Sequence, residues 1–227
     1  MNKQAVTTLA EQINQLLPQT QCTKCGYPAC KDYATALADG TALHNQCPPG
    51  GQAGITRLAQ LLGKPVLTLN PKNGDERRRQ IAFIDDTACI GCTLCIQACP
   101  VDAIMGANKQ MHTVIPELCT GCDLCLPPCP VDCISMRETD DPATGWQAWS
   151  QSEAVAARQR YESRAARLQK EKQENEARLL RKAHEKLAVV SAEIASTQTD
   201  IDEKERKKKI IADAIQRAAA KRAATQE

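Results

Sequence analysis

The chain has 227 residues, of which 3% are aromatic and 25% are charged, and its formal net charge at pH 7 is +2. This length favours one or two domains. So few aromatic side chains exclude an ordinary hydrophobic core as the only support of a folded body, because large apolar groups must offset the entropy of the chain.

The sequence divides into two unlike parts near residue 150. Residues 1–150 contain all 13 cysteines, all 11 glycines and all 12 prolines, and their 11 basic and 14 acidic side chains give a net charge of −3. Residues 151–227 contain 18 basic and 13 acidic side chains, a net charge of +5. We therefore expect a turn-rich body followed by a helix-forming tail.

In the first 79 residues the apolar spacing predicts three helices. Val6, Leu9 and Ile13 share one face of the first helix, and Gly63 is the expected stop of the third. We predict helices at residues 5–17, 32–39 and 52–62. We also predict a turn at 48–51, a short strand at 66–69 and a polar linker at 71–79.

An internal repeat follows, in which residues 89–104 and 119–134 are identical at ten of sixteen positions. Each half is expected to contain a strand, a cysteine loop, a short helical turn and a second strand. The four strands are predicted at 81–85, 103–106, 112–115 and 134–137. The expected fold class is α+β, with a small α-rich domain ahead of a pseudo-two-fold domain that contains two antiparallel hairpins.

No glycine or proline follows Gly145, and the tail is rich in good helix formers. Leu180, Leu187 and Ile194 recur every seven residues, which predicts a weak coiled-coil seam. Serine and threonine near 196–199 predict a break in the helix. The expected domains are 1–70, 80–140 and 150–227.

The cysteines of the repeat are spaced C-x2-C-x2-C-x3-C-P twice, which is the bacterial pattern for [4Fe–4S] clusters. In two-cluster ferredoxins the fourth cysteine of each run ligates the other cluster. Cluster A is therefore expected to take Cys89, Cys92, Cys95 and Cys129, and cluster B to take Cys119, Cys122, Cys125 and Cys99. Gly91 and Gly121 would let backbone amides approach the sulfurs. A zinc ribbon is the alternative, but it needs no third closely spaced cysteine.

A first cysteine module precedes the repeat, with ligand spacing at Cys22, Cys25, Cys30 and Cys47. By spacing alone, zinc and an iron–sulfur cluster both remain open there. Cys133 is the thirteenth cysteine, and we interpret it as a small buried residue rather than a spare thiolate. Since metal binding contributes to folding, we expect the body to be unfolded or molten without its metal.

The run LPQTQCTKCGYPAC at 17–30, NQCPPGG at 45–51, and the double ferredoxin repeat resemble the B subunit of the Rnf/Rsx electron transport complex. The resemblance covers about residues 13–140. It implies a third [4Fe–4S] cluster, cluster C, on Cys22, Cys25, Cys30 and Cys47. It also implies a relay of low-potential electrons between a ferredoxin-type donor and an oxidoreductase or Rnf/Rsx-type subunits. Family members usually begin with a membrane-spanning helix; here we find no apolar run of about 18 residues and expect a form without one.

The function predicted from these motifs is electron transfer through three [4Fe–4S] clusters. No nucleotide fingerprint occurs, so we expect no NAD, flavin or ATP site and no substrate site of the chain's own. The alternative function is an iron–sulfur sensor of redox state or oxygen that acts through the tail. We expect a cytoplasmic location, or peripheral attachment to the cytoplasmic face of the inner membrane, and we disfavour nucleic acid as a partner of the basic run at 204–209.

Overall fold

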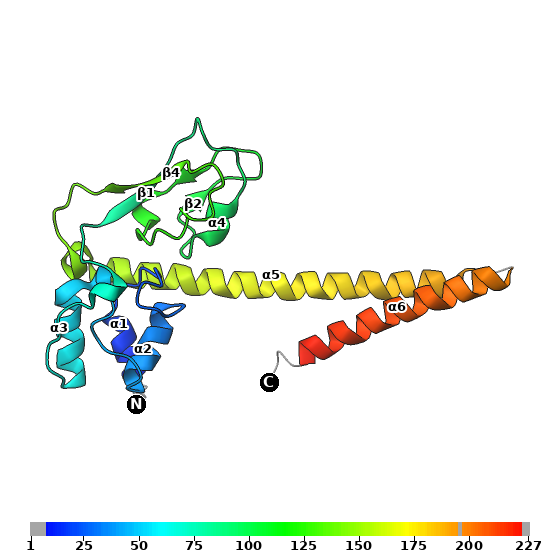
Figure 1. Cartoon of the computed structure of the whole chain (residues 1–227), viewed down its shortest axis with the longest axis horizontal. Coiled ribbons are helices and arrows are strands. Elements are labelled where there is room, and N and C mark those ends of the chain that lie inside the picture. Colours follow the sequence, from blue (N-terminus) through cyan, green and yellow to red (C-terminus); the bar gives the residue numbers. More distant parts are fainter. Residues whose placement is uncertain (1–7, 195–196, 224–227) are drawn as a thin grey trace, which may run out of the picture. The chain divides into compact units, whose positions relative to one another are not determined.

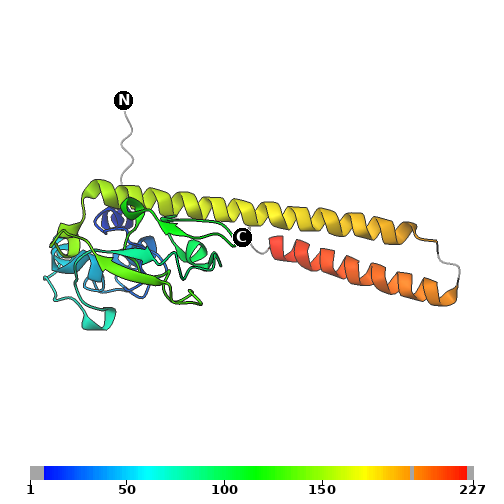
Figure 2. The same cartoon turned by 90° about the horizontal axis from the view of Figure 1, so that it is seen from above.

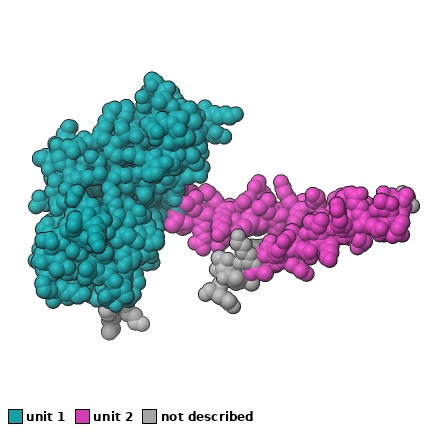
Figure 3. All heavy atoms as spheres, viewed as in Figure 1, with its two compact units in different colours: residues 1–164 teal, residues 165–227 magenta. Residues whose placement is uncertain are grey.

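The computed structural model of the chain describes residues 8–194 and 197–223. The chain forms two compact units, residues 1–164 and 165–227 (Figure 1, Figure 3). Among the described residues, no helix is both long enough and apolar enough to cross a membrane.

The N-terminal part of the first unit is helical, as predicted. Its helices are α1 (Leu9–Gln15), α2 (Cys30–Ala38) and α3 (Gly51–Leu62), and the 3-10 turn η1 (Pro48–Gly50) directly precedes α3. Thr8 caps α1 by accepting a hydrogen bond from the amide of Glu11, while residues 5–7 of the predicted helix lie outside the described residues. Gly63 ends α3 in the left-handed conformation, at φ 62°. The helices enclose a core that contains Ile13, Leu17, Tyr33, Leu37 and Leu58.

The short strand predicted at 66–69 is wrong. The segment has no partner strand, and side chains bind its carbonyl groups instead. Asn45 donates to the carbonyl of Thr68 at 2.7 Å, and Gln52 donates to that of Leu67 at 2.8 Å. The apolar spacing of this segment resembled a strand, but the backbone is satisfied without one.

The four strands predicted in the repeat are all present. They are β1 (Gln80–Ile84), β2 (Ile104–Met105), β3 (Thr113–Val114) and β4 (Ile134–Glu138), with the short helix α4 (Leu94–Ala98) between β1 and β2. The linker before β1 contains η2 (Pro71–Asn73), and η3 (Pro116–Leu118) follows β3.

Two antiparallel sheets form, and only one of them is a hairpin. β2 pairs with β3 across a turn, whereas β1 pairs with β4 from the far end of the repeat, in a register that sets Ile84 against Ile134. The prediction of two hairpins is therefore corrected to one hairpin and one pair of terminal strands. Both cysteine loops therefore lie, in sequence, between the two strands of the β1–β4 pair.

The two halves repeat their local backbone conformation. Left-handed residues recur at an interval of thirty, at Gly91 and Gly121, Thr93 and Asp123, and Asp102 and Asp132. The buried core between the loops has twelve members, and six of them are cysteines. The stability of this core therefore depends on what the cysteines hold.

The turn η4 (Gly145–Ala148) and the start of α5 (Gln151–Ala192) complete the first unit. Trp146 is 2% exposed; its indole N–H donates to the carbonyl of Leu16, and its ring lies 4.6 Å from the guanidinium of Arg57. Ala154 and Ala157 on α5 are buried. The first turns of α5 thus pack with the cysteine-rich body up to Arg164, where the compact unit ends.

The second unit consists of the rest of α5 and of α6 (Gln198–Ala223), which doubles back beside it (Figure 1, Figure 2). The break predicted near 196–199 falls between these helices, although residues 195–196 lie outside the described residues. Thr197 caps α6 through its hydroxyl and Asp200. Of the described side chains at 165–220, only Val190 is buried, and Ile194 is 95% exposed. The coiled-coil seam remains a prediction.

Candidate metal centres

The first cysteine module is organised by a loop of buried polar side chains. Gln21 accepts a hydrogen bond from the amide of Cys30 at 2.9 Å, at the first residue of α2. The side chain of Gln21 in turn donates to Gln19, which donates to Asn14 on α1. Gln19 and Gln21 both have left-handed backbones, with φ of 58° and 54°. These sparsely populated conformations lie directly before Cys22, the first cysteine of the module.

The four cysteines of this module are all buried. Burial raises the pKa of Cys25 and Cys47, and raises that of Cys30 to about 12. The charge of Cys22 raises each of these pKa values further, so the four sulfurs are close enough to repel one another as thiolates. Four thiolates therefore need a positive centre between them, which a bound metal supplies.

The second site brings Cys99 together with the other cysteine loop. Cys99 lines one small cavity with Cys119, Cys122 and Cys125, and apolar side chains close it on several sides: Ala82, Val101, Ile104 and Met136. Burial raises the pKa of Cys122 and Cys125 to about 12, and the charges of Cys99 and Cys119 add to this effect. The cavity is the arrangement expected if the fourth cysteine of the first run crosses to the second loop.

Backbone amides point at two of these sulfurs. The amide of Ala103 donates to the Sγ of Cys99 at 3.2 Å, and the amide of Ala82 on β1 donates to the Sγ of Cys119 at 3.5 Å. Such donors favour the thiolate form and are one means by which a protein adjusts a bound iron–sulfur cluster.

The third site lies around Cys89, Cys92 and Cys95. Cys89 and Cys92 are the two ligand candidates that are only partly buried; the other ten are buried. Cys95 Sγ lies 3.2 Å from Nδ1 of the buried His112, an interaction that the spacing of the histidines did not reveal.

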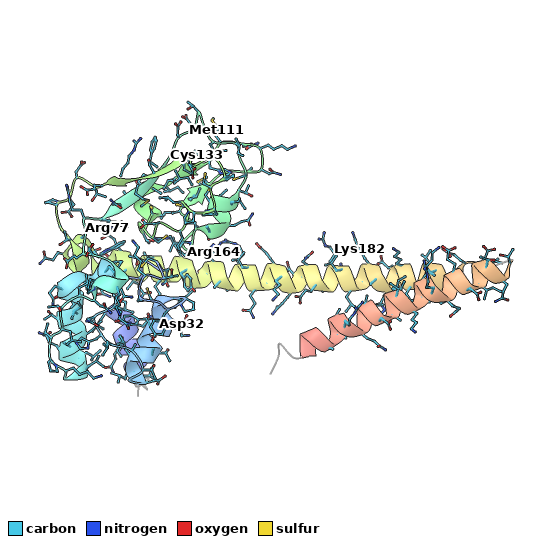
Figure 4. The ribbon with its side chains drawn as sticks, in the orientation of Figure 1. Asp32, Arg77, Met111, Cys133, Arg164 and Lys182 are labelled. Atoms are coloured by element: carbon cyan, nitrogen blue, oxygen red, sulfur yellow. The ribbon has the colours of Figure 1, made fainter. Side chains whose placement is uncertain are left out.

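Cys129 and Cys133 complete this region. Their Sγ atoms are 3.5 Å apart, and burial together with the contact to Cys129 raises the pKa of Cys133 to about 12. The charge of Cys89 also acts on Cys133, so Cys89, Cys129 and Cys133 are neighbours. Cys133 lies inside the lobe that the repeat forms, whereas Met111 lies at its tip (Figure 4). Cys133 is 9% exposed, in agreement with a small buried residue.

The donor set at the three sites fits an iron–sulfur cluster. Every candidate ligand is a free thiol, with no disulfide among the thirteen cysteines, and thiolates are the ligands of [4Fe–4S] clusters. Within residues 8–194 and 197–223, no group of three His, Cys, Asp or Glu side chains is arranged to hold a single metal ion.

The first module touches the second loop directly, through residues that sequence reasoning missed. Thr120 donates to the carbonyl of Thr20 at 3.0 Å in a buried contact. Lys24, between Cys22 and Cys25, forms an ion pair of 2.7 Å with Asp123, and Arg77 pairs with the same carboxylate oxygen. No sequence pattern indicates such a contact, because its partners are about one hundred residues apart.

Two known protein families match the regions of the chain that contain the cysteine motifs. A family described as "4Fe-4S dicluster domain" matches residues 82–136, and one described as "Putative Fe-S cluster" matches residues 17–49. The chain is 58% identical over 139 residues to the B subunit of the ion-translocating oxidoreductase complex of Azoarcus sp. (strain BH72), covering 61% of this chain and 76% of the relative.

Two further proteins with the same name are similar. The protein of Pseudomonas aeruginosa (strain UCBPP-PA14) is 59% identical over 143 residues, 63% of this chain and 74% of the relative. That of Thiobacillus denitrificans is 58% identical over 109 residues, 48% of this chain and 58% of the relative.

Proposed function

Since the chain belongs to the family of B subunits of ion-translocating oxidoreductase complexes, an iron–sulfur electron-transfer family, we propose that it relays electrons through three [4Fe–4S] clusters. The ligand sets would be those expected from the sequence. Cluster C takes Cys22, Cys25, Cys30 and Cys47; cluster B takes Cys99, Cys119, Cys122 and Cys125; cluster A takes Cys89, Cys92, Cys95 and Cys129.

The observation that carries this proposal is the cavity shared by Cys99 and the second cysteine loop. A run of cysteines that bound only its own cluster would leave Cys99 with the first loop. An exchange of fourth cysteines would be in keeping with a pseudo-two-fold ferredoxin domain, and we propose domains at 1–70, 80–140 and 150–227.

The contacts between the loops support an order for the relay. Thr20 and Lys24 adjoin Thr120 and Asp123, so cluster C would lie next to cluster B. The exchanged cysteines would keep B next to A. Because Cys89 and Cys92 are partly exposed, cluster A would be the one that exchanges electrons with an outside protein. In this scheme the residues hold and insulate the clusters, and the clusters supply one-electron carriage.

The outside partners would be a ferredoxin-type donor and the other subunits of an ion-translocating oxidoreductase complex, on the cytoplasmic face of the membrane. The sensor alternative is not favoured, because each proposed cluster has four cysteines and needs no labile ligand. The substrate chemistry would belong to the partners.

The proposal is tested by anaerobic purification, iron and sulfide analysis and EPR spectroscopy of the reduced protein. Three clusters predict about twelve irons. About eight irons with one zinc would reject cluster C and assign the first module to zinc.

The exchange of cysteines is tested by paired substitutions. Cys99→Ser and Cys122→Ser should perturb the same EPR signal, and Cys129→Ser and Cys92→Ser should perturb the other. If Cys99→Ser and Cys92→Ser act on one signal instead, each run binds its own cluster and the exchanged ligand sets are wrong.

A further inference from the structure

Two arginines that are far apart in the sequence donate hydrogen bonds to the second cysteine loop. Arg79, just before β1, donates to the carbonyl of Cys119 at 3.2 Å. Arg160, on the third turn of α5, donates to the carbonyl of Leu118 at 3.1 Å. The two guanidinium groups thus bind consecutive carbonyls beside one proposed ligand of cluster B. Neither family match extends to α5, since they end at residues 49 and 136.

The charges of the two arginines are balanced differently. Arg79 forms an ion pair of 2.6 Å with Glu153 and lies over the ring of Trp149. Arg160 pairs with no carboxylate among the residues that the structure describes. The Nε atoms of both arginines are buried without a hydrogen-bond partner. A guanidinium in proteins does not lose its proton.

Three other cations near the cysteine loops pair with carboxylates. Lys24 and Arg77 share Asp123, and Arg164, which points from α5 toward the lobe of the repeat (Figure 4), pairs with Asp102. Arg160 differs from these three cations, because no described carboxylate pairs with it.

An unpaired, partly buried cation is costly unless an anion lies close to it. Burial lowers the pKa of Arg160, and the negative charge of Cys99 acts in the opposite direction, so Cys99 lies within electrostatic reach. The anion that would balance Arg160 is the cluster with its four thiolates, which becomes more negative by one charge when it is reduced.

We propose that Arg160 is a positioning residue that sets the reduction potential of cluster B, by placing an uncompensated positive charge from α5 at the carbonyl of Leu118, directly before Cys119. The proposal rests on the ligand set of cluster B given above. A fixed cation stabilises the more negative, reduced form, so Arg160 raises the potential of cluster B above the value that its buried pocket alone would give. The two halves of the repeat would thereby differ in potential despite their similar sequences.

The test uses the full-length, anaerobically purified protein in redox titrations followed by EPR. Arg160→Gln is expected to move one reduction step to more negative potential and to leave the others in place, with iron and sulfide content unchanged. The step that moves should be the one that Cys99→Ser perturbs. Arg160→Lys, which keeps the charge, should show a smaller shift.

Arg158→Gln is the matched control. It removes the same charge two residues earlier, where Arg158 binds Glu11 and Glu162, and it should leave all potentials unchanged. Equal shifts in both variants, or full iron content with no shift in Arg160→Gln, would overturn the proposal.

Arg160→Met has a side chain of similar volume and no charge. Its reduction potentials are measured if Arg160→Gln binds less iron. The same negative shift in Arg160→Met supports the proposal. Loss of iron in both charge-free variants would assign Arg160 to assembly and overturn a role in potential. A protein in which Cys99→Ser and Cys122→Ser affect different signals would instead reject the ligand set of cluster B, a separate failure.

Discussion

Two glycines let the cysteine loops meet other backbone segments. At Gly91 a Cβ atom would lie 2.5 Å from the amide nitrogen of Gln110, and at Gly121 it would lie 2.3 Å from the carbonyl oxygen of Gln80. Both have positive φ, at 70° and 63°. The sequence pattern assigned these glycines to close approach around the sulfurs. The structure identifies the neighbour in each case as backbone, which cannot move aside as a side chain would.

Gly121→Ala should lower the free energy of unfolding of the cluster-loaded protein by about 2–4 kcal/mol and reduce its iron content. The left-handed backbone accounts for about 1–2 kcal/mol, and the overlap with Gln80 for the rest. Denaturant unfolding under anaerobic conditions and iron analysis measure both effects.

Gly63→Ala is the control for that prediction. Gly63 has the same left-handed backbone, but a Cβ there would meet nothing within 4 Å. It should cost only about 1–2 kcal/mol and keep all the iron. Equal losses in the two variants would mean that backbone overlap at Gly121 contributes nothing.

Cys133 occupies the position that Ala103 occupies in the other half of the repeat. Ala103 is 1% exposed, which indicates that a methyl group suffices at this place. Cys133→Ala should therefore retain full iron content and change the free energy of unfolding by no more than about 1 kcal/mol. Cys129→Ala should lose cluster A in the same iron and EPR assays. Loss of iron in Cys133→Ala would make Cys133 a ligand and contradict its assignment as a packing residue.

At the scale of elements, the start of α5 belongs with the iron–sulfur body. Arg158 binds Glu11 on α1 through both carboxylate oxygens, and this interaction lowers the pKa of Glu11. Gln151 donates to the carbonyl of Gln15 at 3.0 Å. From the other face, Arg164 binds the carbonyl of Gln97, between two proposed ligands. The first turns of α5 thus connect the first cysteine module to the repeat.

Truncation after Arg164 should therefore leave iron content and the thermal midpoint of residues 1–164 close to those of the full chain. Truncation after Ser150 should lower both the iron content and the thermal midpoint. It removes the buried side chains of Ala154 and Ala157, which exposes the surface they cover, and it removes ion pairs worth about 0.2–1 kcal/mol each. Iron analysis and thermal unfolding distinguish the two. Equal behaviour of both truncated proteins would show that α5 gives the body no support.

At the scale of the whole molecule, the two units depend on different interactions. The cores of residues 1–164 are built around cysteines and small apolar side chains. Residues 165–223 are held mainly by helical hydrogen bonds and by pairs one turn apart, such as Glu203 with Lys207. Loss of the clusters should affect only the first unit.

Removal of iron with a chelator should abolish the protease resistance of residues 1–164, because metal binding supplies much of their folding free energy. The helical circular dichroism of residues 165–223 should persist. The matched sample is the untreated protein under the same anaerobic conditions. A body that resists protease after complete iron removal would show that its apolar core is sufficient, contrary to the expectation from its aromatic content.

The sequence by itself determined where the cysteine motifs, the helices and the four strands of the repeat lie. These features depend on local spacing: C-x2-C turns, apolar residues every three or four positions, and glycine or proline at the ends of elements. The strand predicted at 66–69 failed for the same reason, since local spacing does not reveal that Asn45 and Gln52 bind its carbonyl groups.

Only the tertiary structure decided which distant segments meet. It paired β1 with β4, placed Lys24 against Asp123, and brought Arg160 to the carbonyl before Cys119. These contacts join residues about 40 to 100 positions apart, and nothing in the local spacing of either partner encodes the other. The ion pairs at Asp123 and Asp102 are equally a property of the folded chain, whereas Arg160, beside the second cysteine loop, has no described carboxylate partner.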